Sequence, residues 1–122
     1  MKLENIKFKA KRLDNREWVE GDLMKESYSA RIIEHTSKAD NWIAVDPSTV
    51  CQFTGLKDCE GNEIWEGDII SSPHFERVAT VKWDDSLCGF KCSDVTGNIN
   101  FCFTAIAHCS EWSIVGNKFD KK

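Results

Sequence analysis

Apolar and basic residues alternate near the start of this chain. Ile6, Phe8 and Ala10 hold the even positions, and Lys7, Lys9 and Lys11 hold the odd ones. This period of two predicts a strand over residues 6–10 with one apolar face and one basic face. Further strands are predicted over residues 17–23, 28–35 and 42–45. The segment 30–36 also fits a single helical turn, because its apolar residues follow neither the strand period nor the helix period.

A tight reversal follows the first third of the chain. Two apolar stretches, residues 52–56 and 63–70, flank Glu60-Gly61-Asn62. Glycine and asparagine tolerate positive φ, which a tight turn between paired strands requires. The pattern therefore predicts a β-hairpin.

The second half of the chain carries a similar series of short alternating segments. Strands are predicted over residues 67–72, 77–83, 87–93, 98–103 and 111–115, with a helical turn over residues 104–109. Ala79, Val81 and Trp83 share one predicted face, and Cys88, Phe90 and Cys92 share another. Five strands with one helical turn before the last are typical of an SH3-like small barrel.

The predicted fold is therefore mainly β. Residues 1–46 form an N-terminal antiparallel sheet of hairpins, residues 47–64 a linker and hairpin, and residues 65–122 the SH3-like barrel. The Asp46-Pro47 step marks the first boundary, because the residue before proline is pushed out of helical geometry.

Length and charge limit the classes of function. The chain has 122 residues and a net charge of -4, which argues against a general nucleic-acid or membrane-surface binder. Its longest apolar runs fall far short of the roughly 20 residues that span a bilayer, and its first residues lack the apolar core of a signal peptide. We expect a protein of the host-cell cytoplasm.

The six cysteines are expected to be free and buried. A reducing cytosol disfavours disulfides, and the spacing lacks the paired Cys-x2-Cys steps of a zinc site. If residues 87–93 form a strand, Cys88 and Cys92 share a face but lie about 13 Å apart, too far to chelate one ion. No metal and no cofactor is predicted.

Acidic and histidine residues are the remaining candidates for chemistry. Glu66-Gly67-Asp68 and Asp84-Asp85 fit a cation site but fit turns better, because neither offers alternating oxygen ligands. The histidines His35, His74 and His108 each fit a general base, yet the sequence shows no nucleophile and third group around any of them. No catalytic residue is predicted, and we expect the protein not to be an enzyme.

The residues 52–70 resemble the signature of the YopX family of phage and prophage proteins. The likeness rests on Gln52-Phe53-Thr54-Gly55-Leu56-Lys57-Asp58, followed by Gly61 and by Trp65-Glu66-Gly67-Asp68-Ile69. Residues 6–10, 17–23, 45–50, 81–85 and 114–117 are also similar to segments of that family, whereas residues 93–101 do not align. The resemblance implies a phage or prophage origin but no particular activity.

The sequence therefore predicts a non-catalytic interaction module. Self-association through the N-terminal half is expected, because a short sheet leaves an edge that a second copy can cover. A phage or host protein is the other expected partner. By analogy with SH3-like folds, the contact rim would comprise His74, Phe75, Asp84 and Asp85.

The alternative is nucleic-acid binding through the face of Lys7, Lys9 and Lys11. Phosphate binding favours such a basic stripe. The net acidic charge, and the lack of an aromatic residue interleaved with the lysines along the strand, make a solvated strand the favoured interpretation.

Overall fold

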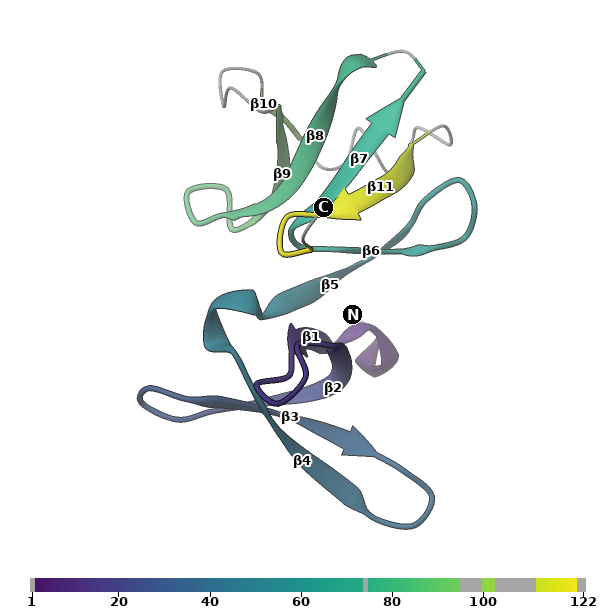
Figure 1. The fold of residues 1–122 in the computed structure, drawn as a ribbon. Helices are drawn as coiled ribbons and strands as arrows, with labels where there is room; N and C mark the ends of the chain where they lie inside the picture. The colour runs from purple at the N-terminus through teal and green to yellow at the C-terminus, as the bar shows by residue number, and fades with distance from the viewer. Residues whose placement is uncertain (1, 74, 95–99, 103–111, 121–122) are drawn as a thin grey trace. The chain divides into compact units, whose positions relative to one another are not determined.

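The chain is described here by a computed structural model that covers residues 2–73, 75–94, 100–102 and 112–120, without the side chains of residues 75–77 and 100–102. It contains two compact units, Met1–Phe53 and Thr54–Lys122, coloured along the chain in Figure 1. The division falls inside the predicted linker and hairpin range of residues 47–64. The fold is mainly β, as the sequence predicts.

Unit 1 is an antiparallel sheet in which neighbours in sequence pair in space. Its elements are η1 (Leu3–Asn5), β1 (Phe8–Lys11), β2 (Trp18–Lys25), β3 (Ala30–His35), β4 (Asp40–Val45), η2 (Pro47–Thr49) and the first part of β5 (Cys51–Lys57). The strand order is β4-β3-β2-β1-β5-β6, and the division between the units falls within β5. The helical alternative for residues 30–36 is wrong, because β3 pairs with β2 on one side and β4 on the other.

The core of unit 1 lies on one face of this sheet. It consists of Ala10, Val19, Ala30, Ile32 and Val45, all buried. The register explains the set, because Ala10 lies opposite Val19 and Ala30 opposite Val45. The alternate residues of each strand occupy the opposite face, which we call the outer face.

Gly21 allows β2 and β3 to approach each other closely. A Cβ atom at this position would overlap the carbonyl oxygen of Ile33, and this contact is with backbone, which cannot move aside as a flexible side chain would. Any larger residue at position 21 therefore separates the two strands.

The end of β1 reaches the end of β4. Arg12 forms an isolated bridge with Val45, and the Leu13 N–H donates to the Ala44 carbonyl at 3.1 Å. These contacts occupy the outer edge of β4 at its last two residues and leave residues 40–43 at the edge of the sheet.

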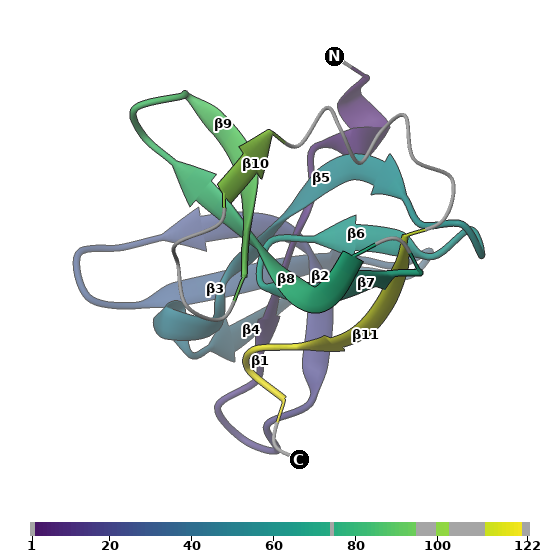
Figure 2. The ribbon, with the colours of Figure 1, turned by 90° about the horizontal axis from the view of Figure 1, so that it is seen from above.

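Unit 2 contains the predicted hairpin and a second antiparallel sheet, of which Figure 2 gives the view from above. Its further strands are β6 (Glu63–Trp65), β7 (Asp68–Ser72), β8 (Phe75–Asp84), β9 (Gly89–Asp94), β10 (Asn100–Cys102) and β11 (Ser113–Asn117). The strand order is β10-β9-β8-β7-β11, and the core includes Ile64, Ile70, Ala79, Val81, Cys92 and Trp112.

Neither sheet closes on itself among the described residues, so the SH3-like barrel is not confirmed. The helical turn predicted for residues 104–109 lies outside the described residues. None of the helices that the structure describes has the length and apolar character that crossing a membrane requires.

Two predicted faces differ from the structure near the turn between β8 and β9. Trp83 shares the face of Ala79 and Val81 but is 44% exposed, because it stands beside the turn and beyond the core. Cys88 precedes β9 and has a φ of 49°, so it belongs to the turn and is exposed. The strand predicted over residues 87–93 begins two residues later than expected.

The hairpin turn is organised by a buried carboxylate. Asp58 accepts hydrogen bonds from the backbone N–H groups of Glu60 at 2.9 Å, Asn62 at 2.8 Å and Ile114 at 3.2 Å. Burial, the largest single effect, raises the pKa of Asp58, but these hydrogen bonds together lower it below its usual value. The ionised carboxylate therefore connects the turn to β11.

Replacing Gly61 by Val should lower the free energy of unfolding by about 1 to 3 kcal/mol, because a β-branched residue is strained at positive φ. Gly61 has a φ of 85°, and a Cβ atom there would meet no atom within 4 Å, so crowding does not contribute. Gly61→Asn is the matched control, since asparagine tolerates this conformation. Equal stabilities of the two variants in urea unfolding would contradict the turn assignment.

Replacing Asp58 by Asn should cost about 1 to 3 kcal/mol at neutral pH, because one acceptor oxygen becomes an N–H donor facing other donors. A lowered pKa in the folded state stabilises the fold above the unfolded value of 3.8 and ceases to do so as the pH falls through the folded value. The difference between the two proteins should therefore shrink below about pH 3.8. Glu60→Gln, an exposed change in the same turn, is the control, and a loss as large as that of Asp58→Asn would refute the anchoring role.

Candidate functional site

The predicted rim residues Asp84 and Asp85 are engaged within their own turn. Asp84 accepts hydrogen bonds from the N–H groups of Ser86 at 2.8 Å and Leu87 at 3.3 Å, and pairs with Lys91 at 2.8 Å. The contact with Lys91, followed by those with Ser86, lowers the pKa of Asp84 far below its usual value. Asp85 accepts from the indole N–H of Trp83 at 2.7 Å.

The other two rim residues give no side-chain geometry. His74 lies outside the described residues, and Phe75 begins β8 without a described side chain. The rim stays a prediction.

The acidic segment Glu66-Gly67-Asp68 contains a second structural carboxylate. Asp68 is buried, and it accepts from the Trp65 N–H at 2.7 Å and from the Asn117 side-chain amide at 2.9 Å. Such contacts are those of a turn anchored to a neighbouring strand. Across the described ranges, no three His, Cys, Asp or Glu side chains come together as a metal site would need.

The cysteines divide between core and surface. Cys51 and Cys92 are buried, as predicted, whereas Cys59 and Cys88 are exposed, contrary to the prediction. Both exposed thiols lie outside the strands, where alternation does not determine which side chain faces inward. These four are free thiols, Cys102 lies in β10 without a described side chain, and Cys109 lies outside the described residues.

The lysine face of β1 contacts aromatic rings. Lys7 Nζ lies 4.8 Å from the centroid of Phe53, and the Nζ atoms of Lys9 and Lys11 lie 4.6 and 5.1 Å from the larger Trp18 ring system. These are cation–π distances. The expectation of a lysine face without interleaved aromatics is therefore wrong: the rings come from β2 and β5, on either side of β1, and no pattern along β1 could reveal them.

Charge is distributed unevenly between the units. Residues 1–53 contain nine of the 16 basic residues and nine of the 20 acidic residues, so the formal charge of unit 1 is zero. The net charge of -4 therefore comes from residues 54–122. Net acidity is not an argument against an anionic partner for unit 1.

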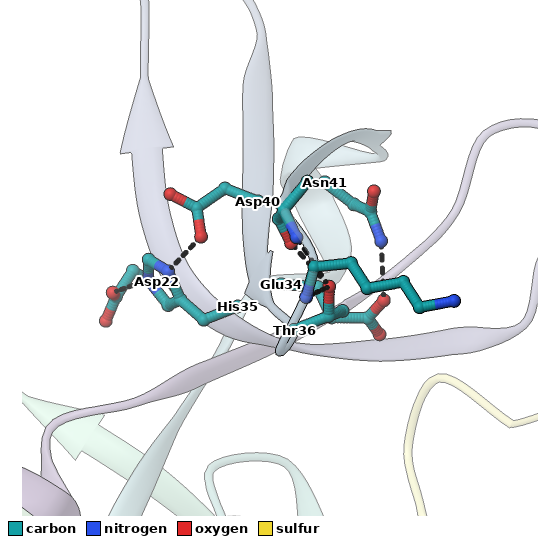
Figure 3. Close-up of polar contacts among 8 residues, drawn as sticks. Asp22, Glu34, His35, Thr36, Asp40 and Asn41 are labelled. Atoms are coloured by element: carbon teal, nitrogen blue, oxygen red, sulfur yellow. Dashed lines mark hydrogen bonds and ion pairs between the residues drawn. The ribbon is translucent and has the colours of Figure 1, made fainter.

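The outer face of unit 1 also holds a histidine between two carboxylates (Figure 3). His35 Nε2 lies 2.6 Å from Asp22 Oδ2, and His35 Nδ1 lies 2.8 Å from Asp40 Oδ1. The residues come from β2, β3 and β4, which lie side by side in the sheet. His35 is directly opposite Asp40 and diagonal to Asp22, which itself lies opposite Ile33.

This arrangement suits an imidazolium better than a catalytic base. The hydrogen bonds to Asp22 and then to Asp40 raise the pKa of His35 above its ordinary value of 6.5. Both ring nitrogens face carboxylates, which leaves neither placed to accept a proton from a hydroxyl or thiol. The sequence identifies His35 as a candidate but not its partners, which only the strand register brings to it.

The edge of β4 presents an exposed apolar patch. Trp42 is 54% exposed and Leu13 is 58% exposed. Both line a shallow pocket of about 240 Å³ whose walls are Arg12, Leu13, Asp14, Trp42, Ile43 and Ala44. We call Leu13 and residues 40–43 the β4 edge patch. Sequence reasoning missed it, because exposure of Trp42 depends on which strand lies at the edge.

Comparison with known proteins places this chain in one family. Among curated proteins, none matches it in sequence. The family described as YopX protein matches residues 7–121, nearly the whole chain, including the hairpin of β5 and β6 and the outer face of unit 1. The match confirms the resemblance drawn from residues 52–70, and the chain belongs to the YopX protein family.

Proposed function

We propose that this protein is a non-catalytic interaction module of phage or prophage origin that associates with itself in the host cytoplasm. The observation that carries the proposal is the β4 edge patch. Strand β4 stands at the edge of its sheet, and a half-exposed Trp42 lies on it beside Leu13.

Edge strands pair readily with other chains, and proteins usually protect them. Here the bridge from Arg12 protects only the last part of β4, and residues 40–43 remain at the edge. Tryptophan is among the residues that contribute most to binding when an interface buries them. A patch of this kind is consistent with an interface.

A second copy is the partner that fits this patch most simply. Two identical edges can pair antiparallel about a two-fold axis, so that each residue of the patch contacts the corresponding segment of the other copy. The formal charge of unit 1 is zero, so two such units carry no net repulsion. The acidic excess of residues 54–122 favours solubility of the assembly.

We also propose that unit 2 is an SH3-like small barrel whose rim of His74, Phe75, Asp84 and Asp85 meets a phage or host protein. The support is the succession of five antiparallel strands in the order β10-β9-β8-β7-β11. This second surface is independent of the β4 edge patch.

Light scattering over a range of concentrations tests self-association. The mass of the wild-type protein should rise above that of one chain, and Trp42→Glu should return it to one chain by placing a charge in the interface. Tyr28→Ser changes an almost fully exposed side chain of the same unit and should have no effect.

A single-chain mass for the wild type up to about millimolar concentration would refute self-association. Unchanged assembly of Trp42→Glu would show that the contact surface lies elsewhere.

The lysine face supports a second candidate function, which is binding to nucleic acid. Lys9 and Lys11 both contact Trp18, so ammonium groups and an aromatic ring occur together on the outer face. Basic groups that follow a phosphate backbone and rings that stack with bases are the two elements of single-strand binding sites.

Replacing Lys7, Lys9 and Lys11 together by Ala should abolish the weak binding to DNA that this candidate predicts. The salt dependence of log K should become shallower by about three contacts' worth, at roughly 0.7 to 0.9 per phosphate neutralised. The matched control replaces Lys2, Lys25 and Lys38, which removes the same charge elsewhere in unit 1. Fluorescence anisotropy measures both, and equal losses in the two triple variants would count against a specific lysine face.

A further inference from the structure

The cluster of Asp22, His35 and Asp40 adjoins the β4 edge patch. Asp40 is the first residue of β4 and, with Trp42, lies on the outer face, because Asp40 is opposite His35 and Trp42 is opposite Ile33. Figure 3 shows the Asp40 carboxylate directed at the imidazole ring across the β3–β4 hairpin. The state of His35 therefore acts on the strand that the proposed self-association uses.

The two contacts of His35 require two protons. A carboxylate only accepts hydrogen bonds, and a neutral imidazole has a single N–H group. Loss of one proton leaves a ring nitrogen lone pair facing a carboxylate at 2.6 or 2.8 Å, so one of the two contacts must break. The formal charge of the cluster changes at the same time from -1 to -2.

The proton of His35 exchanges with solvent, because the three side chains are 53 to 59% exposed. Other charged groups near the cluster have partners of their own. Glu20, the next outer-face residue of β2, lies 4.0 Å from Lys7 and opposite Lys9 on β1.

On the hairpin of β3 and β4, Glu34 accepts a hydrogen bond from Asn41 at 3.3 Å. Lys38 is exposed in the turn of this hairpin, and Arg31 lies four residues before His35 on β3. Asp22 and Asp40 are the carboxylates in contact with the imidazole.

We propose that protonation of His35 promotes self-association through the β4 edge patch, so that the assembly responds to pH. The inference rests on the proposed self-association. The imidazolium holds Asp40, and with it the start of β4, against β3, which keeps the exposed edge in the geometry of a strand.

Electrostatics acts in the same direction. Pairing of two β4 edges brings two of these clusters near each other, within a distance over which salt screens charge only partly, since the Debye length is about 8 Å at physiological ionic strength. Each cluster carries -1 with the imidazolium and -2 without it, so deprotonation increases the repulsion between the copies.

The sign follows from the contacts. His35 has its pKa raised by Asp22 and Asp40, so the imidazolium contacts are complete below the ordinary value of 6.5 and are lost as the pH rises through the higher folded value. Association is therefore strongest on the acidic side of that transition.

Sedimentation velocity of the full chain at about pH 5.5 and pH 8.5, on either side of the histidine range, tests the proposal. The wild-type dissociation constant should rise about tenfold or more at the higher pH. His35→Arg, charged at both values, should associate tightly at both. His35→Gln, neutral at both, should associate weakly at both. His74 and His108 are present in every protein and cannot produce a difference among them.

The results separate the two ideas. A wild-type protein that stays a single chain at both pH values would overturn self-association, and this inference with it. A wild type that associates equally at both values, or a His35→Gln variant that keeps the wild-type pH dependence, would overturn the inference alone. An NMR titration of the imidazole nitrogens provides a second readout: two protonated nitrogens at pH 5.5 are expected, and a single one would refute the clamp.

Discussion

The central strand β1 is the constraint on which unit 1 depends. It is four residues long, yet it pairs with β2 on one side and β5 on the other, and the residue that follows it bridges to β4. Its strict alternation directs Ala10 into the core and the lysines to the outer face. A slip of one residue would exchange these faces, burying ammonium groups and exposing the core. Both the lysine face and the protected end of β4 therefore depend on the register of this short strand.

Local pattern predicted the elements better than it predicted their contacts. The alternation of residues 6–10, the glycine turn at Gly61 and most strands of both units agree with the structure, because period and turn chemistry are properties of neighbouring residues. Cys88 and Trp83 differ because both stand at a turn, where the period no longer applies. The rings near the lysines, and the carboxylates beside His35, come from other strands. Register between strands, which a single sequence does not reveal, decides those contacts.

The acidic residues of the family-like stretch are explained by folding. Asp58 and Asp68 both lie beside tight turns, are buried, and accept backbone N–H groups that would otherwise be left without partners. Sequence reasoning treated the Glu66-Gly67-Asp68 segment as a turn instead of a cation site, and the contacts of Asp68 agree with that interpretation. The outer face of unit 1, by contrast, carries charged and aromatic groups that the fold leaves at least partly open to solvent, and it is where the proposals about partners arise.

The bridge between Arg12 and Val45 also bears on how unit 1 folds. The hairpins β1–β2, β2–β3 and β3–β4 join residues close in sequence and form with little loss of chain entropy. The bridge, and the pairing of Lys9 with Cys51, join residues more than 30 positions apart. Such distant contacts slow folding, because a long loop must close before they contribute. We therefore expect a nascent meander of three hairpins whose closure by β5 is the slow, late event, during which the edge of β1 stays open to wrong partners.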